Sequence, residues 1–182
     1  MPDKLSKLTV HYNNGTTGIV TNITIISIYI ATICYFIYCY ICYNLHWALK
    51  SLLIISTFII AGIIATAILL SPKGYKITDT EVILIRLYKP IHIPIKEILS
   101  IDTVDAKDLK GTIRLLGSSG FYGHWGKFRN TKYGTFYMHT KKNQNMLYIK
   151  CNNGNQYIFQ VDTPITKGII LDKISNNVSE HR

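Results

Sequence analysis

Charged residues are almost absent from the N-terminal part of this 182-residue sequence. Between Lys7 and Lys73 the single Asp, Glu, Lys or Arg is Lys50. A water-exposed fold carries charged side chains on its surface, so this stretch is excluded as an ordinary soluble domain. Lys50 divides it into two apolar runs, approximately Ile19 to Tyr43 and Leu52 to Leu70.

Motifs of catalytic and nucleic-acid sites are also missing. The sequence has no G-x-S-x-G elbow, paired-carboxylate motif or H-E-x-x-H helix. Its lysines are scattered, without a zinc-finger or helix-turn-helix signature. We therefore expect no enzyme, no cofactor and no nucleic-acid partner, and we interpret His124 as a surface or packing residue.

Cysteine is scarce, with four residues. Cys34, Cys39 and Cys42 reproduce the C-x4-C-x2-C spacing of a plant-type iron-sulfur loop. In a helix, however, this spacing does not bring three thiolates to one metal. With Cys151 alone in the remaining sequence, we expect neither a metal site nor a disulfide framework, as in a reducing cytoplasm.

Each apolar run is long enough to cross a bilayer as a helix. A core of roughly 30 Å requires about 20 residues at about 1.5 Å per residue. Hydroxyl groups in the first run can donate hydrogen bonds to the helix backbone. A secretory signal peptide is the alternative for this run, but it starts late and lacks a small-x-small cleavage site. We predict a transmembrane helical hairpin over residues 19–70, after an N-terminal tail over residues 1–18.

The basic residues predict the orientation of this hairpin. Lys4 and Lys7 precede it and Lys73, Lys76 and Arg86 follow it, so the positive-inside rule places both termini in the cytoplasm. Aromatic residues near the connection would form a belt in the outer leaflet. These are Tyr35, Phe36, Tyr38, Tyr40, Tyr43 and Trp47.

Small residues in the second run suggest close packing of helices. Ala61, Gly62 and Ala65 would let a neighbouring backbone approach. The first helix is the nearest candidate, and a homo-oligomer formed through this surface is the alternative.

The remaining sequence, residues 71–182, has a different composition and is long enough to bury a core. It contains 17 basic residues against 9 acidic ones. A basic domain tethered under an anionic leaflet predicts electrostatic contact with lipid. A solvated basic surface is the alternative.

Short runs rich in Ile, Val, Tyr and Phe predict β-strands in this part. An Asn153-Gly154 turn predicts a hairpin between the last two. After a cap at Asp162 or Thr163, the spacing of Ile170, Ile174 and Val178 predicts a C-terminal helix. The strand segments are Tyr75–Ile77, Val82–Leu87, Ile91–Pro94, Ile98–Thr103, Gly134–His139, Met146–Cys151 and Gln156–Val161.

The segment from Leu116 to Gly134 fits neither a regular strand nor a helix. Glycine recurs at every third position, so we predict a loop of irregular shape. Either its aromatic and cationic residues contact the membrane interface or a partner, or its rings cover one mouth of a barrel. The loop-shaping glycines are Gly117, Gly120, Gly123 and Gly126, and the contact candidates are Phe121, Tyr122, His124, Trp125, Lys127, Phe128, Arg129 and Lys132.

This glycine and aromatic segment resembles the signature of the bacterial pleckstrin-homology (PH) domain family, in particular its small membrane-anchored members. The best-matching stretch runs from Arg114 to Gly123 and continues from Trp125 to Gly134. The pattern Ile93-Pro94-Ile95-Lys96-Glu97-Ile98 is similar to the strand and turn that precede it. The resemblance implies a seven-stranded bent barrel closed by a C-terminal helix, at the inner membrane of a bacterium.

The resemblance says less about activity, because PH-like domains bind lipids, peptides or proteins, or act as scaffolds. Members that bind phosphoinositides have basic residues around the first hairpin, whereas this sequence has Thr78-Asp79-Thr80-Glu81 there. Our first hypothesis is a membrane-anchored binding or scaffold protein with a protein partner or the leaflet as its target. The second is an accessory or immunity-type protein whose helices act on a toxin, transporter or channel.

Overall fold

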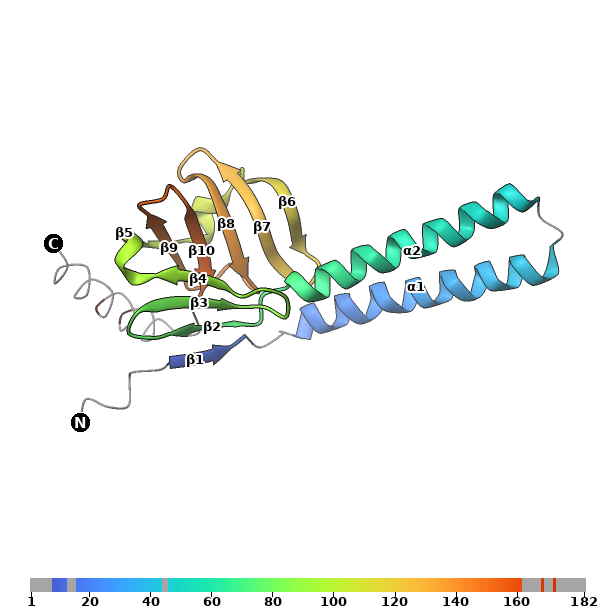
Figure 1. Cartoon of the computed structure of the whole chain (residues 1–182), viewed down its shortest axis with the longest axis horizontal. Helices are drawn as coiled ribbons and strands as arrows, with labels where there is room; N and C mark the ends of the chain where they lie inside the picture. The colour runs from blue at the N-terminus through green and yellow to red at the C-terminus, as the bar shows by residue number, and fades with distance from the viewer. Residues whose placement is uncertain (1–7, 13–15, 44–45, 162–167, 169–171, 173–182) are drawn as a thin grey trace.

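The computed structural model describes residues 8–12, 16–43, 46–161, 168 and 172. Two long helices extend from one end of a β domain (Figure 1). The elements are β1 (Leu8–His11), α1 (Thr16–Cys42), α2 (Trp47–Leu70), β2 (Gly74–Ile77), β3 (Glu81–Ile85), β4 (Ile91–Pro94), η1 (Ile95–Glu97), β5 (Ile98–Val104), η2 (Ala106–Leu109), β6 (Ile113–Gly120), β7 (Gly123–Asn130), β8 (Gly134–Thr140), β9 (Met146–Cys151) and β10 (Gln156–Gln160).

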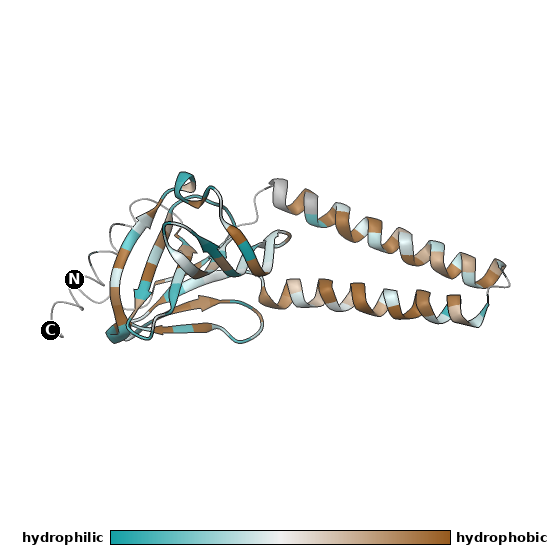
Figure 2. Ribbon diagram, turned by 90° about the horizontal axis from the view of Figure 1, so that it is seen from above, coloured by the Kyte–Doolittle hydropathy of each residue, from teal (hydrophilic) through white to brown (hydrophobic). Residues whose placement is uncertain are grey.

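The two helices coincide with the predicted apolar runs. By length and composition, Asn22–Cys42 and Trp47–Leu70 could each span a membrane. Hydrophobic residues occur all around both helices (Figure 2), and hardly any of this surface is buried within the chain. In α1 the hydroxyls of Thr24 and Thr32 donate to the carbonyls four residues earlier, at 2.9 and 2.8 Å, which satisfies these hydroxyl groups within the helix itself.

The helices lie side by side and contact each other sparsely. The Tyr29 hydroxyl donates to the Thr57 carbonyl at 3.1 Å. At the connection end, the Lys50 ammonium lies 4.8 Å from the centre of the Tyr40 ring. The single charged residue of the apolar stretch is therefore placed at a helix end, where its head can reach a membrane surface.

The β domain consists of two open sheets. One has the order β1-β2-β3-β4, and the other has the order β5-β9-β10-β8-β7-β6, in which β8 and β10 are parallel. Each of the seven predicted strand segments overlaps a strand. The prediction of a closed seven-stranded barrel is wrong, because the described residues form ten strands in sheets that do not close. The additional strands are β1, β6 and β7.

The core lies between the sheets. Tyr75, Leu84 and Ile93 of the first sheet are fully or almost fully buried and belong to one apolar cluster with Leu147 and Phe159 of the second. A second cluster, around Phe128, Phe136 and Met146, lies within the six-stranded sheet. The predicted turn at Asn153 and Gly154 is present between β9 and β10. The predicted C-terminal helix, with Ile170, Ile174 and Val178, lies outside the described residues.

Strand β1 links the start of the chain to the β domain. It precedes α1, yet it pairs antiparallel with β2, which follows α2. His11 lies opposite Gly74, and the Tyr12 amide donates to the Lys73 carbonyl at 2.7 Å. The beginning of α1 and the end of α2 are thus tied to one sheet, so they lie on the same side of any bilayer that the helices cross.

Tyr12 extends this connection to the second sheet. Its hydroxyl donates to the Gln160 carbonyl at 2.7 Å, and its ring is nearly buried beside Tyr75. We expect Tyr12→Phe to lower the free energy of unfolding by about 1 kcal/mol, because one buried hydrogen bond is lost while the ring remains. Urea denaturation of the full-length protein in mild detergent would measure this change. An unchanged midpoint would contradict it.

Candidate membrane-interface site

The glycine and aromatic segment is a β-hairpin, and the prediction of an irregular loop over Leu116 to Gly134 is wrong. Strands β6 and β7 pair antiparallel, with Gly120 opposite Gly123 at the last step. Phe121 and Tyr122 form the two-residue turn, and their rings contact each other edge to face at 4.7 Å between centroids. The tip lies beside the end of α2, since a Cβ on Gly123 would be 3.4 Å from Cδ of Pro72.

A pair of glycines explains why this hairpin looks irregular in the sequence. Gly117 and Gly126 lie opposite each other with φ of 114° and 112°, a region that side chains rarely adopt. A Cβ on Gly126 would lie 2.2 Å from the Leu116 carbonyl oxygen, and one on Gly117 would lie 2.0 Å from that of Trp125. The two strands can therefore pair here only without side chains.

A groove of about 1030 Å³ lies between this hairpin and α2. One wall is the C-terminal half of α2, from Ile59 to Leu70. The other wall is a face of β6, β7 and β8, where cross-strand pairing aligns Ser118 with Trp125 and Lys127 with both Leu116 and Tyr137. No sequence pattern had joined α2 to these strands. We refer to this space as the junction groove.

Cations line the domain side of the junction groove. Arg86, Arg114 and Lys127 contribute to it, and no acidic residue is among the described residues that do. The Lys127 ammonium is 5.9 Å from the centre of the Tyr137 ring. Burial lowers the pKa of Arg86 below its usual range. The groove thus joins a helical wall rich in apolar residues to a positively charged rim.

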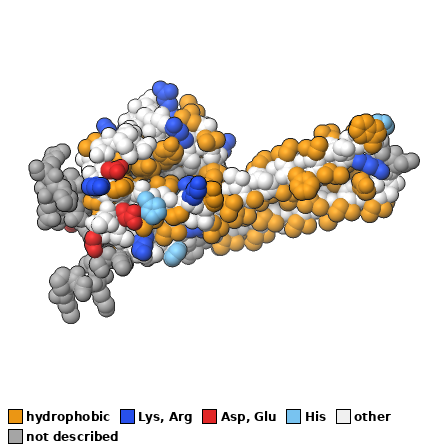
Figure 3. Space-filling model, in the orientation of Figure 1, with side chains coloured by type: hydrophobic (Ala, Val, Ile, Leu, Met, Phe, Trp, Pro, Cys, Tyr) orange, Lys and Arg blue, Asp and Glu red, His pale blue; other side chains and the backbone are white. Residues whose placement is uncertain are grey.

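The loop between β3 and β4 lies at the level of the last turn of α2. The Tyr88 amide donates to the Leu69 carbonyl at 3.0 Å. Leu87 and Tyr88 are 61% and 51% exposed, between Arg86 and Lys89. Exposed apolar and cationic side chains therefore lie together beside the end of α2. Figure 3 shows hydrophobic side chains along the helices and Lys and Arg side chains on the β domain up to its helical end.

A further cation lies at the hairpin tip. The Lys141 ammonium donates to the Tyr122 carbonyl at 3.3 Å. Burial, and then the charge of Lys73, lowers the pKa of Lys141 to about 8. An anion at this end of the domain would relieve the repulsion between the two lysines.

The structure separates the predicted contact residues into different environments. Phe121, Trp125 and Lys127 line the junction groove, and Tyr122 is beside Phe121 in the turn. Phe128 is a core residue, 3% exposed. Arg129 is exposed towards the other end of β7.

His124 is the second residue of β7, near the hairpin tip, and its side chain is half-buried. Its Nδ1 is 2.9 Å from Ser119 Oγ, within hydrogen-bond distance. Burial lowers its pKa. The interpretation of His124 as a non-catalytic residue stays a prediction.

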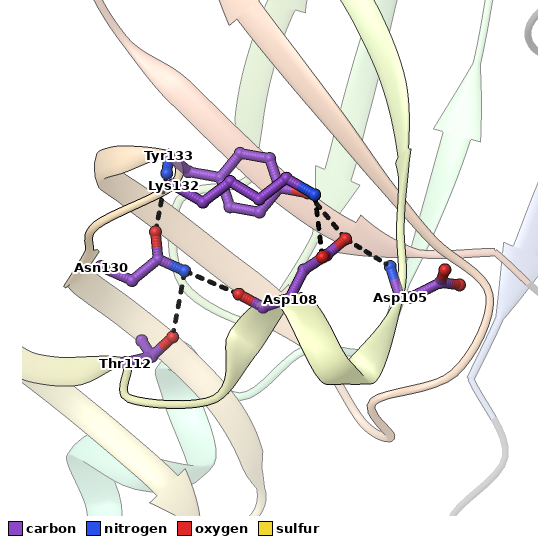
Figure 4. A network of polar contacts seen from close by, with 6 residues as sticks. All are labelled: Asp105, Asp108, Thr112, Asn130, Lys132 and Tyr133. Carbon is purple, nitrogen blue, oxygen red and sulfur yellow. Dashed lines mark hydrogen bonds and ion pairs between the residues drawn. The ribbon is translucent and has the colours of Figure 1, made fainter.

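Lys132 belongs to a polar network (Figure 4) and does not line the junction groove. Its ammonium forms a 2.8 Å ion pair with Asp108 of η2, and this contact, together with the Tyr133 hydroxyl, lowers the pKa of Asp108. The Asn130 amide donates to the Asp108 carbonyl at 3.1 Å. This network holds η2 against the turn between β7 and β8, which is a structural role.

The small residues of α2 do not pack against α1. Ala61, Gly62 and Ala65 are all exposed, and a Cβ on Gly62 would have no atom within 4 Å. Gly62 instead lines the junction groove. A homo-oligomer formed through these residues stays a prediction.

Comparison with known proteins identifies the β domain. The Bacterial PH domain family matches residues 73–163, which is half of the chain. This chain belongs to the bacterial PH domain family, as its glycine and aromatic segment had indicated. No curated protein and no solved structure matches the chain.

Proposed function

We propose that this chain is a membrane-anchored, non-enzymatic binding or scaffold protein that presents its PH domain at the cytoplasmic face of a bacterial inner membrane. The main observation that supports this proposal is that one sheet is attached to both helices. Strand β1 precedes α1 in the sequence and strand β2 follows α2, and these two strands pair directly with each other. Because Ser71, Pro72 and Lys73 alone separate α2 from β2, the domain cannot move far from the helix ends.

The surface beside the helices supports the same proposal. It combines the exposed apolar side chains of Leu87, Tyr88 and Leu116 with the cations Arg86 and Lys89. Rings and aliphatic groups enter the interface favourably, while cations meet the anionic headgroups of a cytoplasmic leaflet. The bilayer is thus the first partner of the domain, and the remaining surface is left for a protein partner.

Sided cysteine labelling would test this arrangement. The four native cysteines are first replaced by Ala, and one cysteine is then introduced at Lys107 in the β domain or at Ala48 near the helix connection. Both native positions are exposed. In intact spheroplasts, a membrane-impermeant maleimide should label the Ala48→Cys protein and should label the Lys107→Cys protein only after permeabilisation. Labelling of Lys107→Cys without permeabilisation would place the domain outside and contradict the proposal.

A further inference from the structure

We propose that the junction groove binds one anionic phospholipid of the leaflet beside the domain. This inference deepens the proposed function, because it requires α2 to lie in the bilayer. The acyl chains would follow α2, and the negatively charged headgroup would lie between Arg86, Arg114 and Lys127. These three cations and the helical wall belong to the same groove.

The length of the helical wall fits one leaflet. From Ile59 to Leu70 the α-helical rise of about 1.5 Å per residue gives roughly 16 Å, and half of a hydrocarbon core of about 30 Å is roughly 15 Å. The wall is lined by Ile59, Ile63, Ala67 and Leu70. An acyl chain that enters at the membrane surface can therefore contact this wall over its whole depth.

The charge of the rim favours an anionic headgroup over a zwitterionic one. Arg114 and Lys127 are exposed, and none of the described residues lining the groove carries a negative charge that could neutralise them. An Arg guanidinium can donate two parallel hydrogen bonds to a phosphate, while a Lys ammonium acts as a point charge. A net negative lipid is attracted by both, whereas a choline group would repel them.

Trp125 adds a donor that has no acceptor among the described residues. Its indole Nε1 is buried and has no hydrogen-bond partner among the described residues, although the side chain lines the groove. An unsatisfied buried N–H group is unfavourable. A phosphate or ester oxygen that reached this nitrogen would supply the acceptor.

This groove differs from the first hairpin of the domain, where Asp79 and Glu81 follow Thr78 at the turn between β2 and β3. Carboxylates at that turn repel a phosphorylated headgroup. The positive rim lies instead on β6 and β7 and on the loop after β3. The junction groove would therefore recognise the net negative charge of a lipid that lies beside α2.

Quenching by brominated lipids would test the proposal in the full-length chain. Trp125 and Trp47 are the two tryptophans, so a Trp47→Phe background leaves Trp125 as the single reporter. The protein is reconstituted in vesicles that contain a small fraction of either brominated phosphatidylglycerol or brominated phosphatidylcholine. We expect phosphatidylglycerol to quench Trp125 at a markedly lower mole fraction.

Charge variants provide the control. Arg114→Gln combined with Lys127→Gln should reduce the preference for phosphatidylglycerol by about 30-fold, since two cations near the surface are removed. The charge-preserving pair R114K and K127R should keep most of the preference. The pair K96Q and K107Q removes two exposed cations outside the groove and should leave the preference unchanged.

Two results would overturn the proposal. One is equal quenching of Trp125 by the two brominated lipids in a protein that resists carbonate extraction. The resistance to extraction would show that the membrane anchor is intact, so the lipid preference alone would be refuted. The other is a preference that survives in the R114Q and K127Q protein, which would place the anionic lipid elsewhere. Loss of the protein from the membrane on carbonate extraction would instead refute the proposed anchor itself.

Discussion

Replacing Gly126 with Ala is expected to lower the free energy of unfolding of the β domain by about 3 kcal/mol or more. The new Cβ would meet the Leu116 carbonyl oxygen at 2.2 Å, and backbone atoms cannot yield as a flexible side chain can. The φ of 112° adds strain. With a total stability of about 5 to 15 kcal/mol, such a loss would remove a large share of the free energy of unfolding. Urea denaturation of the full-length protein, followed by circular dichroism, measures it.

Gly111 offers a matched control for this substitution. It also has a positive φ, 73°, but a Cβ there would meet no atom within 4 Å. Gly111→Ala should therefore cost about 1 kcal/mol, the strain of the left-handed region alone. If the two variants were equally stable, the close approach of β6 and β7 at Gly117 and Gly126 would not be present in solution.

Acidification from pH 7 to pH 4 is expected to remove about 3 kcal/mol of stability through His139 alone. This side chain is 2% exposed, and its Nε2 is 3.1 Å from the Ile85 carbonyl oxygen. Burial lowers its pKa from 6.5 to about 4, and the nearby Arg86 acts in the same direction. The unfolded chain therefore takes up the proton first. Stability is full above pH 6.5, falls as the pH drops towards 4, and changes no further from this group below that.

His139→Gln separates this titration from that of other groups. The variant loses some stability at pH 7, because the packing of the buried ring is disturbed, but it cannot protonate. The decrease in urea midpoint between pH 7 and pH 5 should then be clearly smaller in the variant than in the native protein. An equal decrease in both would show that His139 is not the responsible group.

The helices and the seven strands predicted from the sequence follow from local patterns. The apolar run from Leu52 to Leu70 needs no tertiary context to be recognised, and the alternating runs around Asn153 and Gly154 indicate a hairpin by themselves. Strand β1 was missed because four residues, Leu8–His11, are too few for a period to be visible and their partner lies beyond both helices.

The hairpin of β6 and β7 was missed for a different reason. Glycines at positive φ disturb the two-residue alternation of side chains, and burial along Arg114 to Ser119 shows no regular period. The sequence pattern groups the aromatic and cationic residues of this segment, but Phe128 packs in the core and Lys132 forms an ion pair. Arg86 contributes to the predicted orientation, but its place in the groove depends on a contact with α2 that local patterns do not encode.

The pairing of β1 with β2 also has a consequence for synthesis. A ribosome completes β1 first, but its partner emerges only after α1 and α2 have been made. The first sheet can therefore be completed only when both helices have been made and their ends brought back together. In this chain, synthesis of both apolar helices and completion of the folded domain are successive steps of one biogenesis route.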